Sequence, residues 1–201
     1  IDYRGLKADP THSLSDQFSA FITSLADHLH NANLTLTVIV ALDDQASRAP
    51  FDSTTAYDLP AIGMAADSVE IILPLDPRLY APNGDLDHLL GWLSMAVNRA
   101  KLHISMSLLS VQQTGETFAP ISAADAFAPL GTVAMQQPGA VLPGQPIAVS
   151  LNGMITRFDV EQSTITYFEA TGAIKSVIWV ATADALRGRL ARLSVANVGG
   201  V

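Results

Sequence analysis

The chain has 201 residues, of which 49% are hydrophobic and 15% are charged. This composition excludes a disordered chain and is sufficient for a sizeable core. The net charge is −8 and the few basic residues are scattered, so no basic stripe is present that could follow a phosphate backbone, and we expect no nucleic-acid partner. The absence of cysteine excludes disulfides, thiolate metal sites and thiol catalysis, and leaves the cellular compartment open.

The longest apolar run, residues 34–42, is far shorter than the ~20 residues that a membrane-spanning helix needs. We therefore predict no membrane span. The sequence starts at Ile1 without a charged and then apolar leader, and we interpret its N-terminus as cut or processed.

The first part of the chain alternates between two apolar patterns. Residues 13–31 carry apolar side chains at three-to-four spacing, which predicts an amphipathic helix. Residues 34–42 form a nearly continuous apolar run, typical of a strand covered on both faces, and 68–75 form a second one after a short helix over 58–66.

The alternation continues with a helix over 85–97 and a third strand over 101–109. Strands alternating with helices predict an α/β fold with a parallel sheet. From residue 112 to 178 glycine and proline recur, and the short alternating runs 155–160 and 163–168 predict antiparallel strands, so we expect an inserted α+β lobe. After it, Thr182 is placed to cap one more helix.

Four segments of the sequence resemble family-18 glycoside hydrolases. The first, Ile1-Asp2-Tyr3-Arg4-Gly5, is similar to the end of the family's fourth-strand motif, I-D-W/Y-E-G. The second, residues 72–76, is similar to the sixth-strand M-x-Y-D and keeps Asp76, with Leu75 at the tyrosine position. Residues 101–110 resemble the seventh strand, and residues 166–187 the end of the family's insertion and its following helix, closest to the LysM-associated spore peptidoglycan hydrolases.

The resemblance implies the back portion of a (β/α)₈ barrel, from about the fourth strand to the start of the eighth at residues 197–201. The implied organisation has barrel units over residues 1–111, the α+β insertion over 112–178, and the final barrel helix and strand over 179–201. It further implies an N-acetylglucosamine-containing glycan as ligand, of the chitin or peptidoglycan type.

The position of the family's catalytic glutamic acid is occupied by Arg4. Family-18 catalysis is substrate-assisted and needs that acid to protonate the leaving oxygen. A guanidinium does not release its proton near neutral pH, and Leu75 has no hydroxyl to orient the acetamido group as the family's tyrosine does. We therefore predict that no catalytic set is intact among Asp2, Arg4, Leu75 and Asp76, and that the chain binds glycan without cleaving it.

Barrel sites lie at the carboxyl ends of the strands. A ligand pocket there would contain Asp2, Tyr3, Arg4, Asp43, Asp76 and Tyr80. Arg4 could instead only neutralise Asp2 or Asp76 in a buried pair. The pair Asp43-Asp44 is more typical of a solvated loop than of a metal site, so we assign no metal and no cofactor.

Two other functions stay open. The barrel could be a structural or protein-interaction scaffold in a cell-surface assembly, since fold does not fix function. It could also be an active hydrolase with a relocated acid, for which Glu116 or Glu169 would have to reach the pocket. The resemblance to spore peptidoglycan hydrolases implies an extracellular or cell-surface location in a bacterium.

The implied strands number fewer than the eight of a closed barrel. The first strand, over residues 1–6, and the last, over 195–201, would each present an apolar edge without a partner. We therefore expect the missing strands to come from an upstream segment of the same polypeptide or from a processed partner chain.

Overall fold

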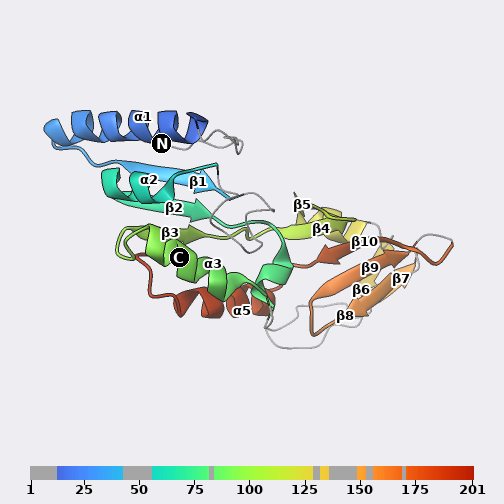
Figure 1. Cartoon of the computed structure of the whole chain (residues 1–201). Coiled ribbons are helices and arrows are strands. Elements are labelled where there is room, and N and C mark those ends of the chain that lie inside the picture. Colours follow the sequence, from blue (N-terminus) through green and yellow to red (C-terminus); the bar gives the residue numbers. More distant parts are fainter. Residues whose placement is uncertain are drawn as a thin grey trace. The chain divides into compact units, whose positions relative to one another are not determined.

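A computed structural model gives the arrangement of the helices and strands (Figure 1). It describes residues 13–42, 56–81, 84–128, 132–135, 149–152, 156–168 and 171–201. The predicted strand over residues 1–6 lies outside these ranges.

The N-terminal part alternates helices and strands as predicted. Helix α1 spans Ser13–Asn31, and strand β1 spans Thr37–Ala41. Helix α2, Leu59–Ala65, begins after Asp58, whose carboxylate accepts a hydrogen bond from the Ala61 backbone N–H at 3.0 Å. An N-cap of this kind satisfies one of the free amides at a helix start.

Strand β2 spans Ser68–Ile72 and is followed by a short 3₁₀ helix, η1, at Pro77–Tyr80. The strand ends earlier than the predicted residue 75, because Pro74 has no N–H for the ladder. Helix α3 spans Leu86–Ala96 and strand β3 spans Leu102–Ser105.

The three strands form a parallel sheet in the order β1-β2-β3, which confirms the predicted α/β arrangement. An isolated parallel bridge joins His103 to Gly200 on the other side of β3. The C-terminal segment therefore lies where the next barrel strand would begin.

One face of this sheet is fully buried. Its side chains alternate along the strands and are at most 2% exposed, with Val38 and Val40 on β1, Val69 and Ile71 on β2, and Leu102 and Ile104 on β3. They form one cluster with residues of α1, α2 and α3, including Ile22, Ile62 and Leu89. The opposite face, which carries Ile39, Glu70 and His103, is only half-buried.

The second group of elements forms an antiparallel sheet in the order β5-β4-β10-β9-β8. Its strands are β4 Ser110–Thr114, β5 Thr117–Ile121, β8 Thr156–Asp159, β9 Thr164–Phe168 and β10 Ile174–Trp179. The pairing of β8 with β9 confirms the antiparallel strands predicted over 155–160 and 163–168.

A short helix, α4 at Ala123–Phe127, packs on this sheet through Ala126. The Tyr167 hydroxyl donates to the Ala126 carbonyl at 2.8 Å and is almost fully buried. Strands β6, Thr132–Met135, and β7, Val149–Asn152, pair with each other as a separate antiparallel pair.

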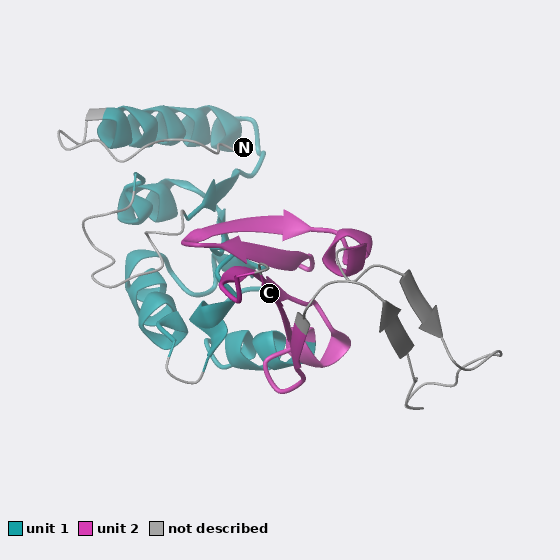
Figure 2. Cartoon of the chain, turned by 90° about the vertical axis from the view of Figure 1, so that its right-hand side faces the viewer, with its two compact units in different colours: residues 1–107, 187–201 teal, residues 108–186 magenta. Residues whose placement is uncertain are grey.

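The chain divides into two compact units, which Figure 2 colours separately. Unit 1 comprises residues 1–107 and 187–201, and unit 2 comprises residues 108–186. The predicted insertion, residues 112–178, falls inside unit 2. Helix α5 spans Ala183–Ser194, and the Thr182 hydroxyl accepts from the Ala185 amide at 3.1 Å, as expected for its cap.

Candidate functional site

The carboxyl end of β2 carries the described part of the predicted site. The ladder continues one residue past the strand, since the Leu73 N–H donates to the Ser105 carbonyl at 2.9 Å. The chain then passes through Pro74 and Leu75 to Asp76, at the start of η1. Because parallel strands end at the same edge of a sheet, this segment lies where a barrel fold places its ligand site.

Asp76 is buried, at 8% exposed, and is held by Arg78. Its Oδ1 accepts from the Arg78 backbone amide at 2.9 Å and from Arg78 Nε at 2.9 Å. Its Oδ2 accepts from Arg78 Nε at 3.0 Å and from Nη2 at 2.7 Å. Both carboxylate oxygens are therefore engaged by an arginine two residues away, and the backbone bond caps η1.

Leu75 is half-buried and presents only hydrocarbon next to this ion pair. The segment that resembles the family's M-x-Y-D thus offers an aliphatic side chain and a carboxylate already paired with a cation. Neither group is a hydroxyl or a protonated acid that could donate to a sugar oxygen.

Tyr80 is part of the packing between η1 and α5. It lies against the core of unit 1, and the guanidinium carbon of Arg189 lies 5.3 Å from the centre of its ring. Burial raises the pKa of Tyr80 to about 12, and the nearby Arg189 charge opposes the rise. The same burial lowers the pKa of Arg189. One face of the predicted ligand-binding tyrosine is therefore occupied by a cation of the same unit.

A second arginine of α5 holds the segment after η1. Arg192 Nη1 donates to the carbonyls of Tyr80 at 3.2 Å and Ala81 at 2.6 Å, and Nη2 donates to Asp87 at 3.0 Å. The chain between β2 and α3 is thus fixed at both ends, by Asp76 and by Arg192. The contacts of Arg192 join residues more than 100 positions apart, so no local pattern could have predicted them.

The half-buried face of the parallel sheet carries polar groups that the sequence analysis did not single out. The Ser105 hydroxyl on β3 donates to Glu70 Oε1 on β2 at 2.5 Å. His103 stands opposite Glu70 in the register. The signal in the sequence is the alternation within 68–71 and 102–105, where every second residue is polar or charged while the others are aliphatic.

The remaining predicted site residues lie outside the described part of the chain. These are Asp2, Tyr3, Arg4 and Asp43, so their place in a ligand pocket stays a prediction, as does an ion pair of Arg4 with Asp2 or Asp76. Of the two candidates for a relocated acid, Glu116 is exposed in the turn between β4 and β5, and Glu169 is outside the described ranges.

Within those ranges, no group of three or more histidine, aspartate or glutamate side chains is arranged to hold a metal ion. Nor does any helix in the described ranges have the length and apolar character needed to cross a bilayer.

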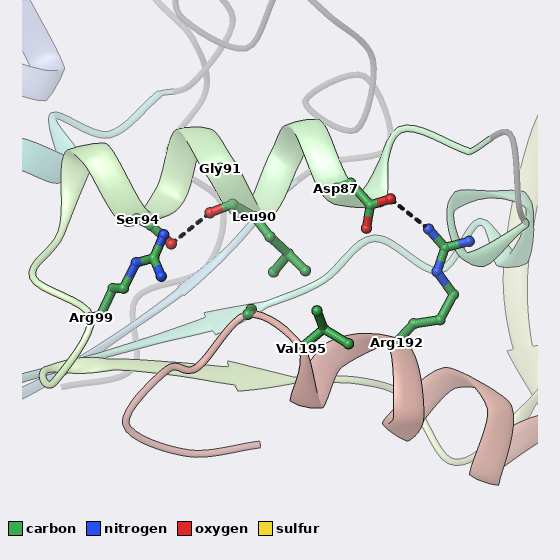
Figure 3. Close-up of a pocket in the computed structure, with 8 residues that line it drawn as sticks. Asp87, Leu90, Gly91, Ser94, Arg99, Arg192 and Val195 are labelled. Carbon is green, nitrogen blue, oxygen red and sulfur yellow. Dashed lines mark hydrogen bonds and ion pairs between the residues drawn. The ribbon is translucent and has the colours of Figure 1, made fainter.

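A cavity of about 270 Å³ lies between α3 and the end of α5 (Figure 3). It is lined by Asp87, Leu90, Gly91, Ser94, Arg99, Arg192, Val195 and Ala196. All of these residues belong to unit 1, and none of them belongs to the predicted strand-end site.

Comparison with known proteins finds similarity in structure only. No protein-family model matches the sequence, and no curated protein matches it. Among solved structures, a chitinase from Chromobacterium violaceum is similar with a TM-score of 0.61 and 20% identity over 100% of this chain. The spore cortex-lytic enzyme SleL of Bacillus cereus has a TM-score of 0.59 at 14% identity, and a class V chitinase from Pseudomonas fluorescens has 0.57 at 15%, both over 100% of this chain.

The match covers only part of each of these proteins. The chain spans 59% of the Chromobacterium chitinase, 44% of SleL and 60% of the Pseudomonas chitinase. It corresponds to the back portion of their (β/α)₈ barrels. The strand order, the parallel register and these matches together confirm the fold that the motifs predict: this chain is folded like the later part of a chitinase-type barrel with an inserted α+β unit.

Proposed function

We propose that the chain binds a glycan containing N-acetylglucosamine, of the chitin or peptidoglycan type, without hydrolysing it. The proposal combines the chitinase-type fold with the residues found where the family keeps its catalytic groups. It assigns the ligand to the strand-end edge of unit 1, with Asp2, Tyr3, Arg4, Asp43 and Asp76 as the lining.

The observation that carries the proposal is the Asp76–Arg78 pair beside Leu75. Substrate-assisted cleavage needs a proton donor at the leaving oxygen and a group that holds the acetamido oxygen in line for attack. Arg4 in the sequence position of the acid offers no transferable proton near neutral pH. Leu75 offers no hydroxyl, and the carboxylate of Asp76 already accepts four hydrogen bonds from Arg78. Loss of general acid catalysis alone costs a factor of ~10²–10⁴ in rate.

The same groups are suited to hold a neutral sugar. A guanidinium donates to hydroxyl and carbonyl oxygens, and a fixed carboxylate accepts from hydroxyls, so an ion pair at the pocket edge can hydrogen-bond a glycan without reacting with it. The side chain of Arg78 is 40% exposed and that of Asp76 is 11% exposed, so the arginine is the more accessible member of the pair.

The similarity in fold supports two further parts of the proposal. The proposed ligand is a wall or matrix polysaccharide, and we therefore propose a location outside the cell or at its surface. Because the chain spans 44–60% of the chitinases and SleL named above, we propose that a further segment of polypeptide, in the same chain or in a processed partner, completes the barrel.

The test is a pull-down of the chain on insoluble chitin and on purified peptidoglycan, followed by a titration with soluble chitooligosaccharides. We expect retention on at least one polymer. Asp76→Ala should weaken binding, because it removes a carboxylate of the proposed site and four hydrogen bonds of Arg78, whereas Asp85→Ala should leave binding unchanged. Asp85 is a suitable control because it lies in the same β2–α3 connection and its side chain makes no cap hydrogen bond.

Folded protein that binds none of these glycans would overturn the proposal and favour the scaffold function. Binding that survives Asp76→Ala would leave glycan binding in place but move it away from the end of β2.

A further inference from the structure

We propose that the groove between α3 and α5 is a second binding site, which takes a small organic anion with a carboxylate at one end and a short aliphatic chain. The site lies on the helical side of unit 1 and is independent of the proposed glycan site. Its volume of about 270 Å³ is just below the ~300–1,000 Å³ typical of pockets for drug-sized ligands, so it suits a smaller one.

Gly91 is the first observation that points to a site. It lies inside α3, and a glycine within a helix makes that helix less stable than an alanine would. No heavy atom of a neighbouring element lies within 4 Å of the place where its β-carbon would stand. In α2, by contrast, a β-carbon at Gly63 would come within 3.2 Å of Val97 Cγ2, so that glycine is explained by packing. Gly91 differs from the equally open Gly188 of α5 in that it lines the groove, where its missing side chain leaves space for a ligand.

An arginine stands at each end of the groove and, in the part of the chain that the structure describes, only one of the two is paired with a carboxylate (Figure 3). At one end, Arg192 donates to Asp87 and to the carbonyls of Tyr80 and Ala81. At the other end stands Arg99, an exposed residue whose guanidinium has no hydrogen-bond or ion-pair partner among the described residues. With two arginines and one aspartate, the lining carries one net positive charge. That charge is complementary to a single carboxylate.

The middle of the groove is apolar. Leu90 from α3 and Val195 from the end of α5 point into it from opposite sides (Figure 3). Ala196 completes this lining. Val195 is 82% exposed, which leaves its surface available to an apolar ligand. The Ser94 hydroxyl donates to the Leu90 carbonyl at 2.7 Å and keeps its own lone pairs free to accept.

These features fit an aliphatic monocarboxylate of about six carbons, with its carboxylate on Arg99 and its chain over Leu90 and Val195. An open groove of this size holds a ligand of few atoms, so we expect a dissociation constant of roughly 1 mM. Hexanoate is the probe. Hexanol keeps the chain and removes the charge, and acetate keeps the charge and removes the chain.

The experiment follows backbone amide shifts of the whole chain by two-dimensional NMR during a titration with hexanoate. We expect saturable shifts at Gly91, Ser94 and Arg99, and much weaker ones with hexanol and with acetate. Arg99→Gln should weaken hexanoate binding at least tenfold. Gly91→Leu should abolish it by filling the groove, without loss of fold.

Gly188→Ala is the matched control for Gly91→Ala. Gly188 is also inside a helix, α5, and also has no neighbour within 4 Å of a β-carbon, but it does not line the groove. Both alanine variants should raise the melting temperature by about 2–4 °C, because alanine favours the helix. Only Gly91→Ala should weaken hexanoate binding.

Three results would overturn the proposal: no saturable shift with hexanoate, equal shifts with hexanol, or unchanged binding in folded Gly91→Leu. Each can occur whether or not the chain binds glycans, so the two proposals fail separately.

Discussion

The two units reach stability in different ways. In unit 1, a parallel sheet buries one face completely under α1, α2 and α3, and a single apolar cluster runs through all of these elements. In unit 2, the apolar cluster on the described part of the antiparallel sheet has four buried side chains, Ala126, Ile165, Tyr167 and Ile178, while Val111 and Phe118 are buried outside it. The strands of unit 1 are therefore held mainly by side-chain packing, whereas unit 2 depends more on its hydrogen-bonded ladder and on single polar contacts.

The largest expected effect is that of removing a central aliphatic side chain from unit 1. Ile71 is 0% exposed in the middle strand, so Ile71→Ala leaves a cavity surrounded by packed groups and should cost about 3–5 kcal/mol. The counterpart in unit 2, Ile178→Ala, should cost less, about 2–3 kcal/mol, because fewer groups surround it. Urea denaturation of both variants measures the difference. Equal losses would show that the two cores are packed alike.

The next largest effect is the dependence of stability on pH through Tyr80 in unit 1. Burial raises the pKa of Tyr80 to about 12. Between pH 10 and 12 the unfolded state loses the phenolic proton while the folded state keeps it, so the stability that is fully present below pH 10 falls as pH rises through this interval. The free energy of unfolding should fall by up to ~3 kcal/mol over this interval.

Tyr80→Phe should remove this part of the pH dependence. Thermal melts at pH 9 to 12, with phenolate absorbance followed in parallel, measure it. A Tyr80→Phe variant whose stability falls between pH 10 and 12 as steeply as that of the unsubstituted chain would contradict the assignment.

The tyrosine of unit 2 should show a smaller effect at neutral pH. Tyr167→Phe keeps the ring in the core but leaves the Ala126 carbonyl without its 2.8 Å hydrogen bond. We expect a loss of about 1–2 kcal/mol, measured by denaturation at pH 7. No loss would mean that the hydroxyl does not support the small core, and would weaken the contrast between the units.

The smallest effects should be equal in the two units. Asp58 caps α2 with a bond to the Ala61 amide at 3.0 Å, and Ser122 caps α4 with a bond to the Asp125 amide at 3.1 Å. Replacement of either by alanine should cost about 0.5–1 kcal/mol, since a cap acts on its own helix end. A much larger loss for Ser122→Ala would indicate that α4 is the element on which unit 2 depends.

The periodic segments were predictable from the sequence. The three-to-four spacing of apolar residues predicted α1 over residues 13–31, where the structure has it, and the apolar runs predicted β1 and β2. The alternation within 163–168 predicted β9. These elements follow from local patterns because each one buries a single face.

The surroundings of the candidate site were not predictable in the same way. Asp76 was placed correctly at the end of a strand, but its partner is Arg78, which follows it directly in η1. Tyr80 was predicted to line the ligand pocket, which stays a prediction, and the structure adds Arg189 over its ring, a partner that the sequence did not indicate. That contact depends on how α5 packs after an insertion of more than 60 residues, and no local pattern carries such information.

The measurement that tests the central claim most directly is the fate of chitohexaose incubated with the chain at micromolar concentration. Mass spectrometry follows the oligosaccharide over a day, and equilibrium dialysis follows the bound fraction in the same sample. We expect a bound fraction that rises with protein concentration, and no shorter oligosaccharide. Release of shorter chitooligosaccharides at a rate proportional to the protein, and lost in Glu116→Gln, would contradict it and identify an active hydrolase with a relocated acid.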